Sequence, residues 1–212
     1  MNFYERQILP PILNCVCGLP LLNGYREGIV KRARGSVLEI GLGSSLNTKF
    51  YAHEQVTEIT GIDPNESLLQ IAAQNESPHQ GKINLIRAVS ERLPFENNRF
   101  DSAVVTFSLC TIPEPVLALE EIKRVLRPGG DLHFCEHGLS DNPKVQKWQR
   151  WLEPLWKPLA GGCHLKRDIF SLISATGFKL HDHETMYVKN IPKFIGYIYK
   201  GSAKKKLMPR LS

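Results

Sequence analysis

Short apolar runs alternate with longer amphipathic stretches between Ser36 and Glu136. Five of the runs are apolar in the middle and bounded by polar residues or glycine, a pattern typical of buried parallel strands: residues 37–40, 58–62, 83–86, 102–107 and 131–135. Apolar residues recur at helical spacing in residues 66–75 and 115–126, and the sequence Arg127-Pro128-Gly129-Gly130 ends the second helix. The alternation predicts strand–helix–strand units and an α/β fold with a mostly parallel sheet.

The segments on either side of this alternation predict the rest of one domain. On the N-terminal side, apolar residues fall on one face of a predicted helix: Ile8, Leu9, Ile12, Leu13 and Val16. On the C-terminal side, a tryptophan-rich segment precedes a predicted helix over residues 168–176 and two strands, 178–186 and 194–200, which would close the sheet as an antiparallel pair. We expect a single domain over residues 1–200, divided into a helical cap (1–34), a ligand-binding core (35–137) and further helices with the closing strands (138–200), and then a flexible basic tail (201–212).

The composition is that of an ordinary soluble globular protein. The 212 residues include 27 Lys+Arg and 21 Asp+Glu, a formal net charge of +6, and 42% are hydrophobic. The longest apolar tract, residues 8–22, is interrupted by prolines and falls short of the roughly 20 residues that a membrane-spanning helix needs. Glu5 and Arg6 precede this tract and no small-residue cleavage site ends it, so it makes a poor signal peptide. We therefore expect a cytoplasmic protein.

Two surfaces leave membrane association open as an alternative. The N-terminal apolar face either packs on the domain, caps a ligand cleft or rests on a membrane surface. The C-terminal end carries Lys200, Lys204, Lys205, Lys206 and Arg210, and is either only solvated or in contact with anionic phospholipid or nucleic acid. Peripheral membrane contact is the most that these features support, and no obligatory protein partner is evident.

The cysteines indicate reduced thiols. There are five of them, an odd number, and none forms a CxxC pair: Cys15, Cys17, Cys110, Cys135 and Cys163. This pattern argues against a disulfide framework and against a zinc site, so we expect no metal.

The candidate chemistry begins where the first predicted strand runs into a glycine-containing turn. Gly41 and Gly43 allow the backbone to approach a ligand closely, and Asp63 follows Gly43 by 20 positions, at the end of the next strand. An acidic residue at that spacing can accept hydrogen bonds from a ribose. Leu46 stands where a dinucleotide-binding fingerprint requires a third glycine, which disfavours a nicotinamide-dependent oxidoreductase. The pattern predicts a nucleoside-containing ligand across the carboxyl ends of the first two strands.

Glu39, two residues before the first glycine, and the distal Asp63 resemble the first two motifs of class I S-adenosylmethionine-dependent methyltransferases. The resemblance continues in Glu91-Arg92-Leu93-Pro94-Phe95, followed by Phe100-Asp101, and in Leu126-Arg127-Pro128-Gly129-Gly130. It implies a Rossmann-like fold with a mostly parallel seven-stranded sheet, helices on both faces and a C-terminal antiparallel strand pair. It also implies S-adenosyl-L-methionine as cofactor, with S-adenosyl-L-homocysteine as product.

Carried over residue by residue, the resemblance implies the following cofactor-binding residues: Glu39, Gly41, Leu42, Gly43, Asp63, Pro64, Asn65, Ser90, Glu91, Phe107 and Ser108. The chain departs from the family pattern at two positions. Ser45 stands where the family usually has a third glycine, which is expected to narrow the pocket. Val89 stands where an Asp commonly meets the adenine, so backbone groups or another side chain must hold the adenine.

Downstream, Cys135-Glu136-His137 and Gly161-Gly162-Cys163-His164-Leu165 resemble a branch that includes alkyl-thiol methyltransferases and bacterial phospholipid N-methyltransferases. The resemblance implies a small lipophilic acceptor, in first place a thiol. The alternatives are a phosphatidylethanolamine-type lipid amine, or a non-catalytic module that only binds the cofactor.

On the acceptor side we expect His137 to act as a general base, the alternative being a histidine bonded only to its neighbouring loop. We expect the acceptor pocket to be lined by Cys163, His164 and Trp156. The alternative is that Cys163 is a buried, unreactive thiol and that the other two are ordinary core residues. The fourth strand ends without the Asn/Asp-Pro-Pro-aromatic sequence of base-amino methylases, and the chain has no Pro-Cys nucleophile. DNA is therefore disfavoured as a partner.

Overall fold

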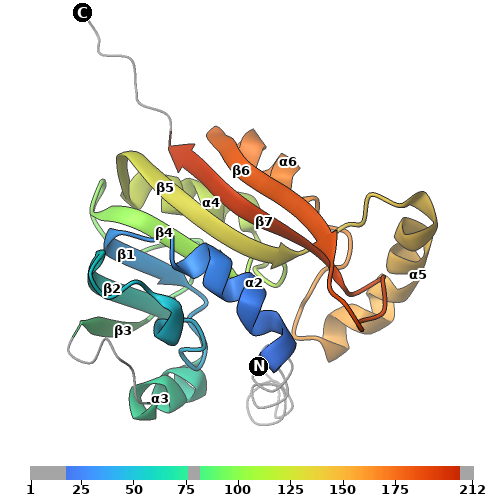
Figure 1. The fold of residues 1–212 in the computed structure, drawn as a ribbon, viewed down its shortest axis with the longest axis horizontal. Coiled ribbons are helices and arrows are strands. Elements are labelled where there is room, and N and C mark those ends of the chain that lie inside the picture. Colours follow the sequence, from blue (N-terminus) through green and yellow to red (C-terminus); the bar gives the residue numbers. More distant parts are fainter. Residues whose placement is uncertain (1–17, 76–81, 206–212) are drawn as a thin grey trace, which may run out of the picture.

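The computed structural model describes residues 18–75 and 82–205, which form a seven-stranded sheet in the order β3-β2-β1-β4-β5-β7-β6 (Figure 1). The strands are β1 (Gly35–Ile40), β2 (Val56–Asp63), β3 (Ile83–Arg87), β4 (Phe100–Thr106), β5 (Leu126–His137), β6 (Phe178–Tyr187) and β7 (Tyr197–Lys205). The first five pair in parallel, and β7 runs antiparallel to both β5 and β6. This topology confirms the predicted α/β fold and its closing antiparallel pair.

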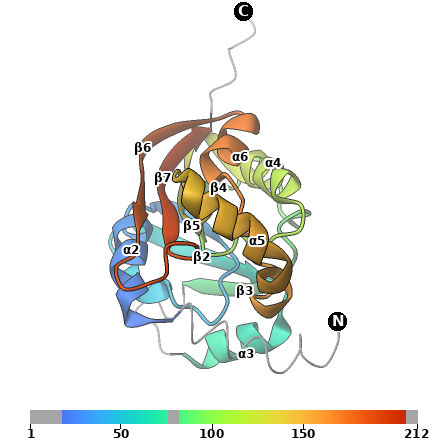
Figure 2. The same cartoon turned by 90° about the vertical axis from the view of Figure 1, so that its right-hand side faces the viewer.

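Helices cover both faces of the sheet, as predicted. They are α2 (Pro20–Val30), α3 (Glu66–Gln74), α4 (Pro115–Val125), α5 (Pro143–Leu159) and α6 (Ile169–Ala175), with a short 3-10 helix, η2 (Thr48–Phe50). Helix α2 lies on one face and α4 and α6 lie on the other, while α5 extends beyond the end of the sheet where β6 and β7 meet (Figures 1 and 2). None of the helices within residues 18–75 and 82–205 has the length and apolar character needed to cross a bilayer.

Local capping explains where two of the helices begin. The Asn65 side chain accepts hydrogen bonds from the backbone N–H groups of Ser67 and Leu68, and so caps α3 directly after β2. The Asp168 carboxylate accepts the backbone N–H of Ser171 at the start of α6. Each cap satisfies donors that the first turn of a helix leaves unpaired.

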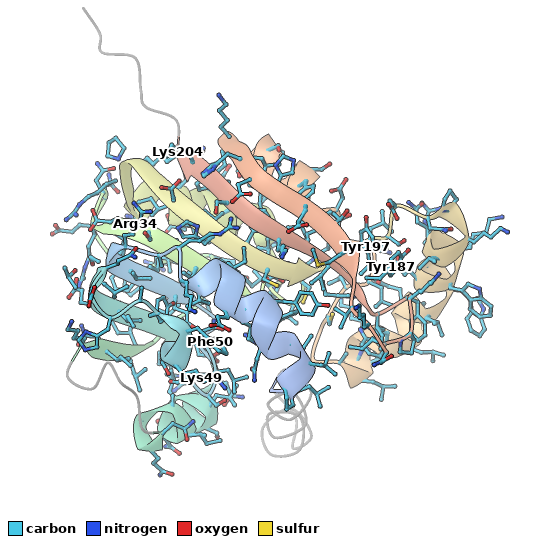
Figure 3. All side chains as sticks on the ribbon, viewed as in Figure 1. Arg34, Lys49, Phe50, Tyr187, Tyr197 and Lys204 are labelled. Atoms are coloured by element: carbon cyan, nitrogen blue, oxygen red, sulfur yellow. The ribbon has the colours of Figure 1, made fainter. Side chains whose placement is uncertain are left out.

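Burial on both faces explains why the central strands are continuously apolar. On β1, Leu38 packs into the larger core, together with α4 and α6, whereas its neighbour Val37 packs into a second core beneath α2. Phe95 and Phe100 meet edge to face in the larger core, with ring centroids 5.1 Å apart. At the far end of the sheet Tyr187 and Tyr197, labelled in Figure 3, join β6 to β7 in the same geometry.

The end of the domain differs from the prediction. Strand β7 runs to Lys205, so residues 201–205, assigned to a flexible tail, are part of the sheet. Gly201, Ser202 and Ala203 resemble a loop in composition, but their small size is what the sheet requires: a Cβ on Gly201 would lie 2.6 Å from the Cβ of His183. The Lys205 ammonium donates to the Leu126 carbonyl. The predicted helix around Ile8–Val16, Cys15, Cys17 and residues 206–212 lie outside the described residues.

Candidate active site

A cleft of about 1540 Å³ opens at the carboxyl ends of the parallel strands. Its floor is formed by the turns after β1, β2, β3 and β4, and its walls by α2, the end of α5 with the loop that follows, and residues 188–198. The strand order reverses between β1 and β4, which is the point where open α/β sheets bind their ligands. Pockets for one small molecule are typically 300–1,000 Å³, so this cleft has room for a cofactor and an acceptor together.

The turn after β1 depends on two glycines in the left-handed backbone region. Gly41 has φ 63° and Gly43 has φ 57°. A Cβ on Gly41 would lie 2.2 Å from the Ser108 hydroxyl, so this glycine lets the ends of β1 and β4 lie against each other. A Cβ on Gly43 would meet no atom closer than 4.0 Å, and Gly43 lines the cleft. The second glycine therefore leaves space for a ligand.

Asp63, at the end of β2, fixes this turn and lines the same part of the cleft. Its Oδ2 accepts the backbone N–H of Gly43 at 3.0 Å and its Oδ1 accepts that of Asn65 at 2.8 Å. Burial raises the pKa of Asp63, and the two backbone hydrogen bonds act against that rise. Each carboxylate oxygen has a second lone pair, which leaves acceptor capacity for ribose hydroxyls.

Ser45 occupies the left-handed region with φ 68°, although it is not a glycine. The structure does not bear out the expected narrowing, because Ser44 and Leu46 line the cleft and Ser45 does not. The consequence of having serine in place of glycine at this position is backbone strain, which is about 1 kcal/mol for a residue with a Cβ.

We expect the Ser45→Gly variant to be more stable than the wild type by about 0.5–1 kcal/mol, because glycine relieves this strain at a small entropic cost. Urea unfolding measures the difference. Ser44→Gly, which removes a neighbouring side chain where φ is not positive, is the control and should not stabilise. Equal or lower stability of Ser45→Gly would show that the strain is absent.

Glu39 lies beneath the turn and does not line the cleft, in contrast to its assignment as a cofactor ligand. Its Oε1 accepts the Asn47 amide at 2.8 Å and its Oε2 accepts the Tyr51 hydroxyl at 2.7 Å. Complete burial raises the pKa of Glu39 to about 7, against the effect of these hydrogen bonds and of the nearby charge of Arg26. The residue therefore holds the turn in place from below.

This buried carboxyl should make folding pH-dependent. The pKa of Glu39 is higher in the folded chain, about 7, than in the unfolded chain, about 4.5, so its stabilising contribution is complete below pH 4.5 and is lost as the pH rises to 7. The stability of Glu39→Gln relative to wild type should therefore increase over this window, by up to about 3 kcal/mol. Urea unfolding at several pH values tests this, with the exposed Glu54→Gln as control. A stability difference that does not change with pH would refute the assignment.

Arg26, on α2, is a cleft residue that the sequence did not reveal. Its side chain is 3% exposed, and its Nη1 donates to the Asn47 Oδ1 at 3.0 Å and the Thr106 Oγ1 at 2.7 Å. The guanidinium lies 4.7 Å from the centroid of the Phe107 ring. Phe107 directly follows β4 and has φ 51°. The Arg26 network thus links α2 to the ends of β1 and β4 and places a positive charge at the cleft.

The turn after β3 borders the cleft through Val89, Ser90 and Glu91. The Ser90 hydroxyl donates to Glu91 at 3.1 Å, and Val89 is 49% exposed. This places the predicted adenine-side residues together at one end of the cleft, while their contacts with an adenine remain a prediction.

The other end of the cleft gathers sulfur and imidazole groups. The Cys163 sulfur lies 3.4 Å from Nδ1 of His137, which ends β5. A hydrogen bond from Cys110 contributes most to lowering the pKa of Cys163 to about 4; burial acts in the opposite direction, and the neighbouring His137 lowers the pKa further. His164 also lines the cleft, and its Nδ1 lies 2.8 Å from the buried carboxylate of Glu153 on α5.

Glu136 supports this cluster from below. It is fully buried, and its carboxylate accepts the backbone N–H groups of Ser108, Leu109 and Cys110. Burial raises the pKa of Glu136 to about 7 against these three hydrogen bonds. The bonds fold the chain after β4 onto the end of β5, and so bring Cys110 next to His137. The remaining wall is apolar: Leu19, Leu22, Val188, Ile191, Ile195 and Ile198.

Comparison with known proteins identifies the family. A model of the methyltransferase domain matches residues 38–134. A thiol S-methyltransferase of Rattus norvegicus is 33% identical over 147 residues, 68% of this chain and 59% of that protein. A thiol S-methyltransferase of Homo sapiens is 31% identical over 162 residues, 74% of this chain and 66% of that protein. The chain belongs to the class I S-adenosylmethionine-dependent methyltransferases. It spans less than two thirds of the length of these two relatives.

Solved structures show the same fold for this methyltransferase. The cyclase SpnF superimposes with a TM-score of 0.71 at 20% identity, over 97% of this chain and 95% of that one. The YcgJ protein of Bacillus subtilis gives a TM-score of 0.69 at 14% identity, over 89% of this chain and 99% of that one. At these identities the likeness shows the fold alone.

Most of the residues predicted for this methyltransferase site line one cleft: Gly41, Leu42, Gly43, Asp63, Pro64, Asn65, Ser90, Glu91, Phe107, Ser108, His137, Trp156, Cys163 and His164. Glu39 does not. Arg26 and Cys110 line the cleft and were missed, because neither belongs to a motif and only the folded chain brings them to the site.

Proposed function

We propose that this protein transfers the methyl group of S-adenosyl-L-methionine to a small lipophilic thiol and releases S-adenosyl-L-homocysteine. The observation that carries the proposal is that one cleft joins the glycine turn and Asp63 to an apolar wall and a thiol–imidazole cluster. The two curated relatives described above are named as thiol S-methyltransferases, which favours a thiol among lipophilic acceptors.

The residues at the β1–β2 end fit the cofactor. Gly43 leaves open space at the turn, and Asp63 retains acceptor capacity for the two ribose hydroxyls. The buried guanidinium of Arg26 would pair with the carboxylate of the methionine part. Ser90 and Glu91 would lie near the adenine. When bound, the cofactor supplies an electrophilic methyl group on a cationic sulfonium.

At the acceptor end, the chain has to align an ionised sulfur and exclude water. In the transfer, the acceptor sulfur forms a bond to the methyl carbon while the bond from that carbon to the sulfonium sulfur breaks. The proton of the thiol has to leave first, and His137 lies at this end of the cleft to promote its loss. The apolar wall, together with Trp156, would bind the hydrophobic part of the acceptor.

The deciding experiment measures S-adenosylhomocysteine release by the purified protein with labelled cofactor. One arm offers a panel of alkyl thiols, a second offers phosphatidylethanolamine vesicles, and a control omits the acceptor. We expect product with thiols. Product with vesicles alone would replace the thiol by a lipid amine. Cofactor binding without product in either arm would indicate a non-catalytic binding module.

A further inference from the structure

Three potential metal ligands meet at the acceptor end of the cleft, from three separate parts of the chain. Cys110 follows β4, His137 ends β5 and Cys163 lies in the loop after α5. Their ligand atoms all lie within 4.8 Å of one another, and all three residues line the cleft. Cys110 and Cys163 are not disulfide-bonded.

The separation of one ligand pair fits what a tetrahedral ion requires. Zinc–sulfur bonds of about 2.3 Å and zinc–nitrogen bonds of about 2.1 Å place the two ligand atoms roughly 3.6 Å apart at a tetrahedral angle. The measured separation of the Cys163 sulfur and the His137 Nδ1 is 3.4 Å. Two sulfurs and an imidazole nitrogen in this geometry are the donor set that zinc prefers.

We propose that Cys110, His137 and Cys163 bind a soft divalent metal ion, zinc in first place, whose fourth coordination position opens into the cleft. A site with three protein ligands and one open position is the form that catalytic zinc takes. His137 is 7% exposed, and the ring nitrogen that faces the Cys163 sulfur is its Nδ1. A buried imidazole nitrogen directed at two thiols is suited to holding a metal ion.

The surrounding charges suit two thiolate ligands. Arg167 interacts electrostatically with Cys110, Cys163 and Glu136, and its Nη1 donates to the Leu109 carbonyl. Two thiolates neutralise a divalent ion, and the Arg167 guanidinium balances the neighbouring Glu136 carboxylate. The backbone N–H of Cys110 is held by Glu136, which fixes the position of this ligand.

Such a site would also specify how the acceptor is activated, a step that rests on the proposed function. An acceptor thiol that binds the ion through the open position loses its proton to solvent and becomes a thiolate. Its sulfur would then form a bond to the methyl carbon as the bond from that carbon to the sulfonium sulfur breaks, which releases S-adenosyl-L-homocysteine. The neutral thioether product is a weaker ligand than the thiolate and would leave the ion. In this arrangement His137 promotes the loss of the thiol proton as a ligand of the ion, and does not itself accept that proton.

The test measures the ion directly, so it does not depend on activity. The full chain is reduced, stripped with a chelator and titrated with Co²⁺, whose thiolate charge-transfer absorption reports sulfur ligation. Zinc is then added as competitor. We expect one Co²⁺ per chain, and Cys110→Ala or Cys163→Ala should weaken binding at least about 100-fold, more than the loss of an outer-shell partner.

The matched controls are Cys135→Ala, which removes a buried thiol packed near Ile198, and the double variant Cys15→Ala/Cys17→Ala. Both should bind Co²⁺ as the wild type does. Wild type without thiolate absorption, or Cys110→Ala and Cys163→Ala that bind like wild type, would overturn the metal site. Cofactor binding is measured on the same samples, so a failure of the proposed function is seen separately.

A second observation concerns the exposed face of α5. Trp148, Trp151 and Leu155 are 60%, 67% and 64% exposed, and their spacing places them on one stripe of the helix. The two indole rings meet edge to face at 5.7 Å. The helix carries four basic residues and one acidic residue, Glu153, which is buried. The exposed surface of α5 is therefore apolar and positively charged.

We infer that this stripe docks α5 on the surface of an anionic lipid bilayer. Tryptophan and leucine on one face, with lysine and arginine around them, are the features of a helix that lies in the membrane interface. Residues 156–159, at the end of the same helix, line the cleft. Docking there would bring the cleft close to lipophilic molecules dissolved in the bilayer.

Vesicle co-sedimentation tests the docking surface. We expect the protein to bind vesicles that contain phosphatidylglycerol and to bind pure phosphatidylcholine vesicles less well. Trp148→Ser/Trp151→Ser should reduce binding at least about tenfold, whereas Leu117→Ser, which removes a 49% exposed leucine from α4, should leave it unchanged. Equal binding by the double variant and wild type, or no binding by wild type, would overturn the inference.

Discussion

Replacing Asp63 by alanine should raise the dissociation constant for S-adenosyl-L-methionine at least about tenfold, a loss of roughly 1.4 kcal/mol or more. The carboxylate lines the cleft at the end of β2 and holds the Gly43 backbone N–H. The variant therefore loses both the acceptor for the ribose and a support of the glycine turn. Isothermal titration calorimetry with the folded variant measures the change.

Asp101→Ala is the matched control for this experiment. Asp101 also accepts a backbone N–H on β1, that of Ser36, but it does not line the cleft and lies in the first part of β4. The Asp101→Ala variant should have a lower free energy of unfolding and an unchanged affinity for the cofactor. Wild-type affinity in folded Asp63→Ala would remove the ribose assignment, and equal losses in the two variants would show a general effect on the sheet.

The parallel core was predictable because its strands are buried on both faces. Residues such as Val37 and Leu38 are adjacent and both apolar, since each contacts a different core. This produces the uninterrupted apolar runs that the sequence displays. The helices between the strands have clear boundaries for a different, local reason, because Asn65 caps α3 and Pro115 begins α4.

The last strand was less predictable, because its residues are selected by contacts with distant segments. Gly201 is next to His183, and the Ser202 hydroxyl lies 2.8 Å from Nδ1 of His133. Glycine, lysine and alanine have low intrinsic preference for strands. Pairing with residues 131–137 of β5 overrides that preference, and no local sequence pattern predicts this pairing.

The residues of the candidate site were also predictable only in part. Gly41, Gly43 and Asp63 are close in the fold because they end neighbouring strands, so their spacing could be interpreted from the sequence. Cys110 and Cys163 are far apart along the chain, so a prediction of no metal site that rests on local cysteine pairs does not consider them together. Their approach depends on Glu136, whose hydrogen bonds to the chain after β4 exist only in the folded protein.

Arg26→Met should destabilise the fold by about 2–3 kcal/mol and also weaken cofactor binding. The guanidinium is buried and joins Asn47, Thr106 and the face of Phe107. Methionine has a similar length but no donor, so the buried Asn47 carbonyl oxygen would lose a hydrogen bond. The positive charge near Glu39 would also be lost, which would raise the pKa of this carboxyl further. Urea unfolding and calorimetry measure the two effects.

Arg32→Met is the control for Arg26→Met. It distinguishes the loss of the Arg26 hydrogen-bond network from the general effect of removing an arginine near α2. Arg32 follows α2, is 35% exposed and pairs with the exposed Asp182, so its loss should cost less than about 1 kcal/mol and leave cofactor affinity unchanged. Similar destabilisation by the two variants would contradict the structural role of Arg26. A destabilised Arg26→Met with normal cofactor affinity would retain that role and remove the pairing with the cofactor's carboxylate.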